Sequence, residues 1–406
     1  MHPAFAWSGF TSAFASIVIG NRLQAELGTF DALFAVVLGN WILFIYSAAI
    51  GYAAGRWGLN SQLVLEAVFG RSGALLPGLV LAFLVTGWFA YHVVLTVAIL
   101  GQAFHVNEMT PLWLGTIGLV FAAPLLLGLS RGFNLTALAF PAMLLFVSIV
   151  SYRYIAPKWA VLLDGPLHGT LPFGTGVCIT FGIFVVSGTM TGDIVRYCQT
   201  GNQAIQATAV GFLVSNLPFL VVGVLVGAIH LTASDLLLSS RPISFLLLSL
   251  ALVAHWTTCD ACLENASVTI KSAFPGLPWI GACCGALGVG MAIAFSGLVG
   301  DVFEWLLLLV TVVAPIGGII LADYYILRAN KGFAHARTAR VNVAALSALV
   351  ATVIGIRFWG SSVSDWASPL VGVPMASLVY LVLVAVMPVG LGTSLGSETL
   401  GAEAVD

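Results

Sequence analysis

The chain has 406 residues, of which 60% are hydrophobic and 7% are charged, and its formal net charge is −2. With a mean hydropathy of +1.07, this composition excludes an ordinary soluble globular protein, and the absence of a basic run gives no sign of a nucleic-acid partner. Apolar runs of about 20 residues, the length of a membrane-crossing helix, recur along the whole sequence. We therefore predict an all-α polytopic membrane protein, and the lack of strand-like alternation argues against a membrane barrel.

Twelve membrane spans are predicted in chain order, at residues 4–22, 30–54, 76–103, 111–129, 134–152, 173–194, 207–231, 243–268, 277–299, 302–327, 341–357 and 367–391. No basic region precedes the first span, so we interpret it as a membrane helix and not as a cleaved signal; its abrupt start leaves open the loss of an N-terminal tail. No soluble domain is visible, so residues 1–406 form one transmembrane domain. The function must then lie among the helices, as transport, channel conduction or intramembrane catalysis.

The distribution of Lys and Arg predicts that both termini are cytoplasmic in a multi-pass protein of the inner (plasma) membrane. With the amino terminus inside, the inner side receives Arg56, Arg71, Arg131, Arg196, Lys271, Arg328, Lys331, Arg337 and Arg340. The outer side receives only Arg22, Arg153, Lys158, Arg241 and Arg357. The six cysteines all lie in or beside apolar segments and are interpreted as small buried hydrophobes, so no cofactor is expected.

Segments about 170 residues apart share their residue character. Span 1 contains "WSGFTSAFASIVIG" and span 6 contains "FGIFVVSGTMTGD"; "VTGWFAYH" in span 3 corresponds to "AHWTTCDA" in span 8. We predict a first repeat at 4–152, a second at 173–327 and two further helices at 341–391. Five spans per repeat make the copies inverted, as in many secondary transporters. The alternative is that glycine and serine simply mark close helix packing.

Two stretches, "SGFTSAFAS" in span 1 and "VVSGTMTG" in span 6, are poor helix formers and predict interrupted helices. An interruption leaves backbone N–H and C=O groups free to bind a polar ligand or a cation. Trp88 and Phe184 are the aromatic residues nearest these polar centres, and such rings would hold a flat ligand by stacking. The alternative for both rings is ordinary core or lipid packing.

The stretch "AHWTTCDACLENAS" at 254–267 concentrates polar groups inside an apolar span. We expect the Thr258 hydroxyl to bond the Ala254 carbonyl, with Thr257 beside it. Carbonyls of Gly9 and Ser12 in span 1 would complete a cage of five neutral oxygens, which suits a monovalent cation such as Na⁺. The alternative is helix packing with local back-bonding.

Asp260 and Glu264 lie one helical turn apart in the same stretch. An acid inside a membrane is costly and usually functional, so a coupling or gating role is one interpretation. Pairing with Lys271 or Arg196 is the other. An intramembrane enzyme is disfavoured because the membrane histidines have no clear catalytic partner, and a channel is disfavoured because the polar residues cluster at mid-depth.

The chain resembles the cytosine permease branch of the nucleobase–cation symporter family over spans 1 to 12. The resemblance rests on "FDALFAVVLGN", "GYAAGRWGL", "TGWF", "SGTMTGDIVRY", "WTTCD" and "PIGGIILADYY". It implies a ten-helix inverted-repeat core of the leucine-transporter type, with broken helices 1 and 6, two extra C-terminal helices and Na⁺-coupled import of a nucleobase-like ring. By position, the resemblance assigns the substrate sandwich to Trp88 and Phe184, substrate-edge contacts to Ala13, Phe14, Val85, Val186 and Ser187, and sodium ligands to Gly9, Ser12, Ala254, Thr257 and Thr258.

The sequence departs from that branch at the substrate edge. Phe14, Val85 and Val186 are apolar where polar side chains are expected, and Cys259 replaces an expected Asn. Apolar side chains cannot hydrogen-bond a cytosine edge. The departure argues against cytosine itself as the substrate. A cytosine-like ring in the wider sense stays the expectation, with another pyrimidine such as hydroxymethylpyrimidine, a purine, hydantoin and allantoin open. Proton coupling through Asp260 or Glu264 is the alternative to Na⁺.

Overall fold

The computed structural model describes residues 3–104, 110–129, 136–163, 169–238, 242–328, 340–359 and 370–387, and within these ranges every regular element is a helix. Arg131, Arg241, Lys331 and Arg337 of the charge argument lie outside them. The α-helices are α1 (Pro3–Thr11), α2 (Phe14–Leu27), α3 (Thr29–Trp57), α4 (Ser61–Phe69), α5 (Leu75–Phe104), α6 (Thr110–Leu126), α7 (Thr136–Val150), α8 (Phe173–Gly182), α9 (Val185–Thr189), α10 (Gly192–Val195), α11 (Gly201–Ala209), α12 (Leu217–Ala228), α13 (Ala233–Leu238), α14 (Pro242–Ala273), α15 (Trp279–Ser296), α16 (Val302–Leu321), α17 (Val343–Trp359) and α18 (Gly372–Val386). Four shorter helical segments of π or 3₁₀ type are η2 (Ser151–Ile155), η3 (Ala156–Leu163), η4 (Val210–Asn216) and η5 (Ala322–Leu327).

Each of the twelve predicted spans contains at least one described helix. By length and apolarity alone, 7 helices of the described chain can cross a membrane, or 8 if α1 and α2 count as one bent span. Four shorter apolar helices, α6, α8, α17 and α18, occupy other predicted spans. The all-helical membrane architecture is therefore confirmed, while the number of twelve crossings stays a prediction.

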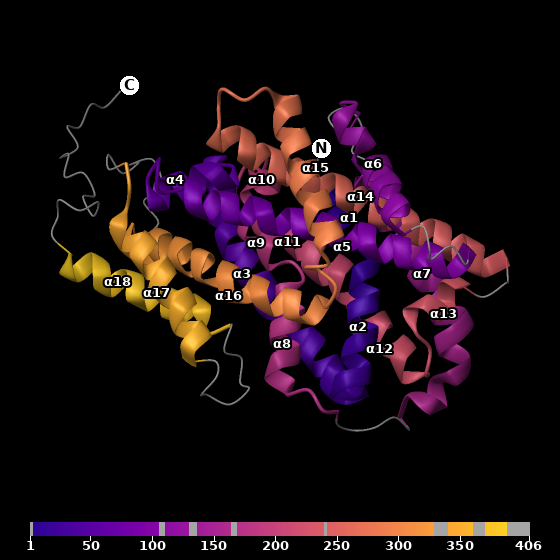
Figure 1. Cartoon of the computed structure of the whole chain (residues 1–406). Coiled ribbons are helices and arrows are strands. Elements are labelled where there is room, and N and C mark those ends of the chain that lie inside the picture. The colour runs from indigo at the N-terminus through magenta and orange to yellow at the C-terminus, as the bar shows by residue number, and fades with distance from the viewer. Residues whose placement is uncertain are drawn as a thin grey trace.

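The helices form two packed groups that meet along α1 and α14. In the first group α2 packs on α12, α3 packs on α8 and α11, and α1 packs on η4. In the second group α5 lies against α14, α15 and α6. Helix α16 covers α8 and α9, and α17 and α18 lie beyond it at the left of Figure 1.

Small residues allow the closest approach inside the first group. A Cβ on Gly20 of α2 would lie 2.2 Å from the carbonyl oxygen of Leu220, and a Cβ on Gly223 of α12 would lie 2.3 Å from the carbonyl oxygen of Ile17. Each glycine thus faces the backbone of the other helix. This contact is the small-residue packing expected of membrane helices, so part of the glycine content is structural.

A buried ionic network stabilises α4, the short helix between α3 and α5. Arg328 pairs with Asp323, and both side chains are almost fully buried. Arg328 also donates to the carbonyl of Ala67 at 2.6 Å, and Asn342 donates to the carbonyl of Val68 at 2.7 Å. Because both carbonyls lie in the last turn of α4, a cation and an amide donor satisfy the negative end of that helix.

The other end of α4 carries a side-chain cap. Asn60 Oδ1 accepts the N–H of Leu63 at 2.8 Å. Replacing an N-cap asparagine by alanine costs about 1 kcal/mol, so we expect Asn60→Ala to lower the free energy of unfolding by about that amount, measured by chemical unfolding in mixed micelles. Asn60→Ser, which retains a cap oxygen, should stay close to the natural chain; equal losses in both variants would contradict the capping role.

Candidate functional site

The first predicted interruption is present in the structure. Helix α1 ends at Thr11 and α2 begins at Phe14, and their axes differ by 47°. Ala13 between them has an extended backbone, with φ −91° and ψ 131°. The break falls inside the stretch predicted from its poor helix formers. It leaves the backbone of Ser12 and Ala13 outside a regular helix at the contact between the two helix groups.

Span 6 is interrupted as well. Helix α8 ends at Gly182 and α9 begins at Val185, while Phe184 between them has φ −129° and ψ 17°. The Phe184 ring packs edge-on against Phe212 and Phe10, with ring centroids 6.0 and 5.9 Å apart. These contacts hold the Phe184 ring at the start of α9, facing α5.

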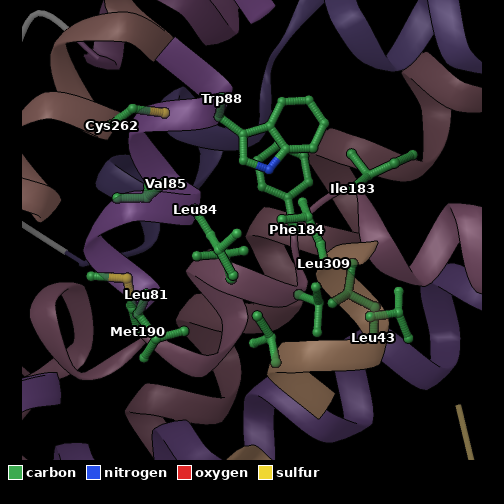
Figure 2. Close-up of a cluster of buried hydrophobic side chains, with 14 of the residues drawn as sticks. Leu43, Leu81, Leu84, Val85, Trp88, Ile183, Phe184, Met190, Cys262 and Leu309 are labelled. Carbon is green, nitrogen blue, oxygen red and sulfur yellow. The ribbon is translucent and has the colours of Figure 1, made fainter. Parts of the chain in front are cut away.

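Trp88 on α5 and Phe184 face each other across the gap between the two helix groups. Their ring centroids are 6.5 Å apart and their planes differ by 12° (Figure 2). The cavity beside them has an accessible volume of about 10 Å³, enough for about one water molecule. A flat ring inserted between the two needs two van der Waals spacings, about 7 Å in total. A small separation of the helix groups would therefore admit a planar ligand.

The cavity brings together some of the predicted edge residues and not others. Ala13 and Ser187 line it. Phe14 instead packs edge-on against Phe146, with centroids 5.5 Å apart. Val85 lies in the apolar cluster drawn in Figure 2, and Val186 is fully buried. In this conformation the three apolar edge positions are therefore packing residues behind the cavity wall.

The predicted sodium ligands lie on elements that touch. Gly9 is in the last turn of α1 and Ser12 follows it, and α1 packs against α14, which carries Ala254, Thr257 and Thr258. Thr258 lines the cavity, is buried, and its Oγ1 has no hydrogen-bond partner among the described residues. Leaving a buried hydroxyl unpaired costs free energy. Coordination of a cation by the Thr258 oxygen would offset that cost.

The expected bond from Thr258 to Ala254 is wrong. Thr257 Oγ1 donates there instead, at 3.1 Å from the Ala254 carbonyl and 3.0 Å from that of Val253. A hydroxyl in a helix reaches the carbonyls three and four residues earlier, and the rotamer of Thr257 takes both. The difference frees Thr258 to face the cavity.

Two histidines that seemed isolated in the sequence are in contact. His92 lines the cavity, and its ring lies 4.9 Å from that of His255, edge to face at 82°. Thr96 Oγ1 donates to the His92 carbonyl and lies 2.7 Å from His255 Nδ1. The one signal in the sequence was the spacing of four residues from Trp88, which puts His92 on the same face of the helix. Phe10, Ile183 and Cys262 also line the cavity and were likewise missed.

A wider cavity of about 220 Å³, here called the vestibule, lies between α1, α10 and α14. Its wall includes Glu264, whereas Asp260 is buried within α14. Lys271, one of the two suggested partners of these acids, donates to the carbonyls of Pro275 and Leu277. Phe10 lines both the vestibule and the cavity at Trp88, so its ring separates them.

Removing that ring should expose the inner cavity. Cys262 lines the cavity and is almost fully buried. In a background where the two cysteines outside the core, Cys198 and Cys284, are serine, we expect Phe10→Ala to raise the rate of Cys262 modification by a small methanethiosulfonate about fivefold, because local opening becomes easier. Phe10→Leu is the control that keeps most of the bulk. An unchanged rate in Phe10→Ala would show that another residue closes the cavity.

Known proteins resemble this chain in sequence. The sequence model of a family described as "Permease for cytosine/purines, uracil, thiamine, allantoin" matches residues 3–383. The cytosine permease of Escherichia coli K12 is 27% identical over 395 residues, which cover 93% of this chain and 89% of that protein. The hydantoin permease of Microbacterium maritypicum is 24% identical over 366 residues, covering 81% and 73%.

The fold also matches a solved transporter. The structure of Mhp1, a nucleobase-cation-symport-1 family transporter, in a closed conformation with bromovinylhydantoin bound, superposes with a TM-score of 0.75. The match covers 95% of this chain and 91% of Mhp1 at 19% sequence identity. At that identity the likeness shows a shared fold.

Proposed function

We propose a transport function for this chain from one established premise: it belongs to the family of permeases for cytosine/purines, uracil, thiamine and allantoin. Within that family of multi-pass membrane transporters, the chain is a secondary active carrier that imports a nucleobase-like planar heterocycle together with Na⁺. The observation that carries the proposal is the near-parallel pair Trp88 and Phe184, one ring from each helix group, 6.5 Å apart at the interrupted spans.

The substrate would lie between these two rings, with its polar edge toward Ala13 and Ser187. Three polar side chains border the cavity: His92, Ser187 and Thr258. The Nδ1 atom of His92 has no partner within the described chain, so it is available to an edge of the substrate. With apolar Phe14, Val85 and Val186, this set favours a ring recognised mostly by stacking and main-chain contacts. A cytosine-like ring leads, and hydroxymethylpyrimidine, a purine, hydantoin and allantoin remain alternatives.

Sodium would bind beside the substrate, between the break in span 1 and α14. The ligands would be the backbone carbonyls of Gly9, Ser12 and Ala254 and the hydroxyls of Thr257 and Thr258. Two observations support this set. Thr258 Oγ1 is buried and unpaired, and the Ser12 hydroxyl is engaged by Ser8 and Ser215, which leaves Ser12 its carbonyl as a ligand. All five ligands are neutral, so the ion is held loosely enough to leave again.

Coupling would follow from the shared position of the ion and the substrate at the break. An ion that ties α1 to α14 stabilises the conformation in which Ala13 and Phe10 border the substrate, so each ligand raises the affinity of the other. Rocking of the two helix groups would then expose the cavity alternately to each side. In this proposal twelve spans form an inverted five-plus-five repeat with two added helices, and both termini are cytoplasmic.

The decisive experiment is a thermal-shift screen of the purified chain with cytosine, uracil, hydroxymethylpyrimidine, purines, hydantoin and allantoin, each with and without Na⁺. A ligand that binds the folded state raises the unfolding temperature, and the shift grows with the ratio of ligand concentration to Kd. We expect at least one heterocycle to stabilise the chain more strongly in Na⁺ than in choline at fixed pH. Stabilisation that follows pH and ignores Na⁺ would favour the proton-coupled alternative through Asp260 or Glu264, and no response to any heterocycle would refute the proposal.

A further inference from the structure

The vestibule carries polar groups that the site at Trp88 does not use. Asn265 on α14 is 9% exposed and lines the vestibule, and its amide makes no hydrogen bond with the part of the chain that the structure describes. Asp193 on α10 is also 9% exposed and lines the same wall. Its Oδ1 accepts the N–H of Ser61 at 3.0 Å, while Oδ2 has no partner among the described residues. Buried polar groups without partners are rare, so the Asn265 amide, which borders the vestibule, points to a ligand.

The composition of the wall selects the kind of ligand. The charges of Arg196 and Glu264 cancel, so the wall carries one net negative charge, that of Asp193. This charge disfavours an anionic ligand. Phe10 and Ala261 supply apolar surface on the same wall. A bare metal ion could use neither the amide N–H of Asn265 nor the apolar surface. A neutral, flat molecule with both donors and acceptors uses all of them.

We propose that the vestibule is a second, weaker substrate site, in which a planar heterocycle with adjacent N–H and C=O groups lies on the Phe10 ring with its polar edge on Asn265. A side-chain amide offers one donor and one acceptor side by side and reads such an edge with two hydrogen bonds. The volume of about 220 Å³ is many times that needed to hold one water, and it is ample for a single-ring heterocycle.

This inference rests on the proposed function, because it places the same substrate class at a second point on its path. Phe10 borders both cavities, so a substrate released from Trp88 and Phe184 reaches the vestibule by passing the Phe10 ring. Of the two aromatic residues on the vestibule wall, Phe10 is buried, whereas Tyr197 is 65% exposed and its ring packs against Arg196. The vestibule thus offers one buried aromatic face where the inner site offers two. Its affinity is therefore lower, which favours release of the substrate away from Trp88 and Phe184.

Binding stoichiometry tests the proposal. The full chain in nanodiscs is titrated with radiolabelled cytosine, uracil and hydantoin by equilibrium dialysis. We expect two bound molecules per chain for the transported probe, one tight and one weak. Asn265→Leu, close in volume but without the amide, should weaken the second event about tenfold and leave the tight one in place. Asn202→Leu, which removes an exposed amide on α11, is the matched control and should bind as the natural chain does.

Transport with a defined direction gives the second measurement. In proteoliposomes sorted by orientation, Asn265→Leu should raise KM about tenfold for transport that starts on the vestibule side and leave KM from the opposite side unchanged. A single bound molecule that Trp88→Ala removes, or a second one that survives Asn265→Leu, would overturn the vestibule site while the proposed function stands. Failure of every probe to bind or to be transported would overturn both.

Discussion

Trp88→Ala is expected to abolish heterocycle binding and uptake. Stacking of a base on one aromatic ring is worth about 1–3 kcal/mol by alanine substitution, and the variant also removes one wall of the cavity. Together these losses should weaken binding roughly a hundredfold or more. The measurement is the ligand-induced shift in unfolding temperature for the best heterocycle of the screen, followed by uptake of that compound into proteoliposomes.

Two matched variants separate stacking from folding. Trp88→Phe keeps an aromatic face and should bind within about tenfold of the natural chain. Trp41→Ala removes a tryptophan that is 45% exposed on the outer surface and should leave ligand affinity unchanged. Full ligand affinity in Trp88→Ala would remove the stacked site, and an equal loss in Trp41→Ala would assign the effect to general destabilisation.

The sequence could locate the interruption of span 1 because helix propensity is a local property. Serine, threonine and glycine gather in residues 8–16, and α1 ends at Thr11 within that stretch. In span 6 the break at Phe184 lies just before the predicted stretch 185–192, which contains the further break between α9 and α10. The number of crossings is harder to read from sequence. A short helix such as α8, with 10 residues, lies inside an apolar stretch long enough to be predicted as a full membrane span. Hydropathy alone therefore cannot decide which of these helices cross the membrane.

The partners across the cavity could not be predicted, since they depend on how α5 and α14 pack. Spacing placed His92 on the face of Trp88, yet nothing in the sequence brings His255 to within 4.9 Å of it. The two threonines show the same limit at a finer scale. Either hydroxyl can reach a carbonyl one turn earlier, and only the packed structure shows that Thr257 takes these bonds and that Thr258 faces the cavity.

That difference makes Thr258 the sharper test of sodium coupling. Thr258→Val keeps the shape of the side chain and removes only the hydroxyl. Because this hydroxyl has no partner within the described chain, the variant loses no protein hydrogen bond, and without Na⁺ it should be as stable as the natural chain or slightly more stable. With one oxygen of the proposed cage missing, the Na⁺ concentration for half-maximal stabilisation should rise at least about tenfold, equivalent to about 1.4 kcal/mol.

The two readouts together distinguish a sodium ligand from a packing residue. Thr208→Val is the matched control, since the Thr208 hydroxyl is buried but bonds the Ala204 carbonyl. It should lower stability without Na⁺, because a local bond is lost, and leave the Na⁺ dependence unchanged. If Thr258→Val lowers stability and leaves the Na⁺ titration where it was, the hydroxyl serves packing. The ion would then have to bind elsewhere, or the coupling ion would have to be a proton, because Thr258 is the one predicted ligand whose side-chain oxygen the described fold leaves unused.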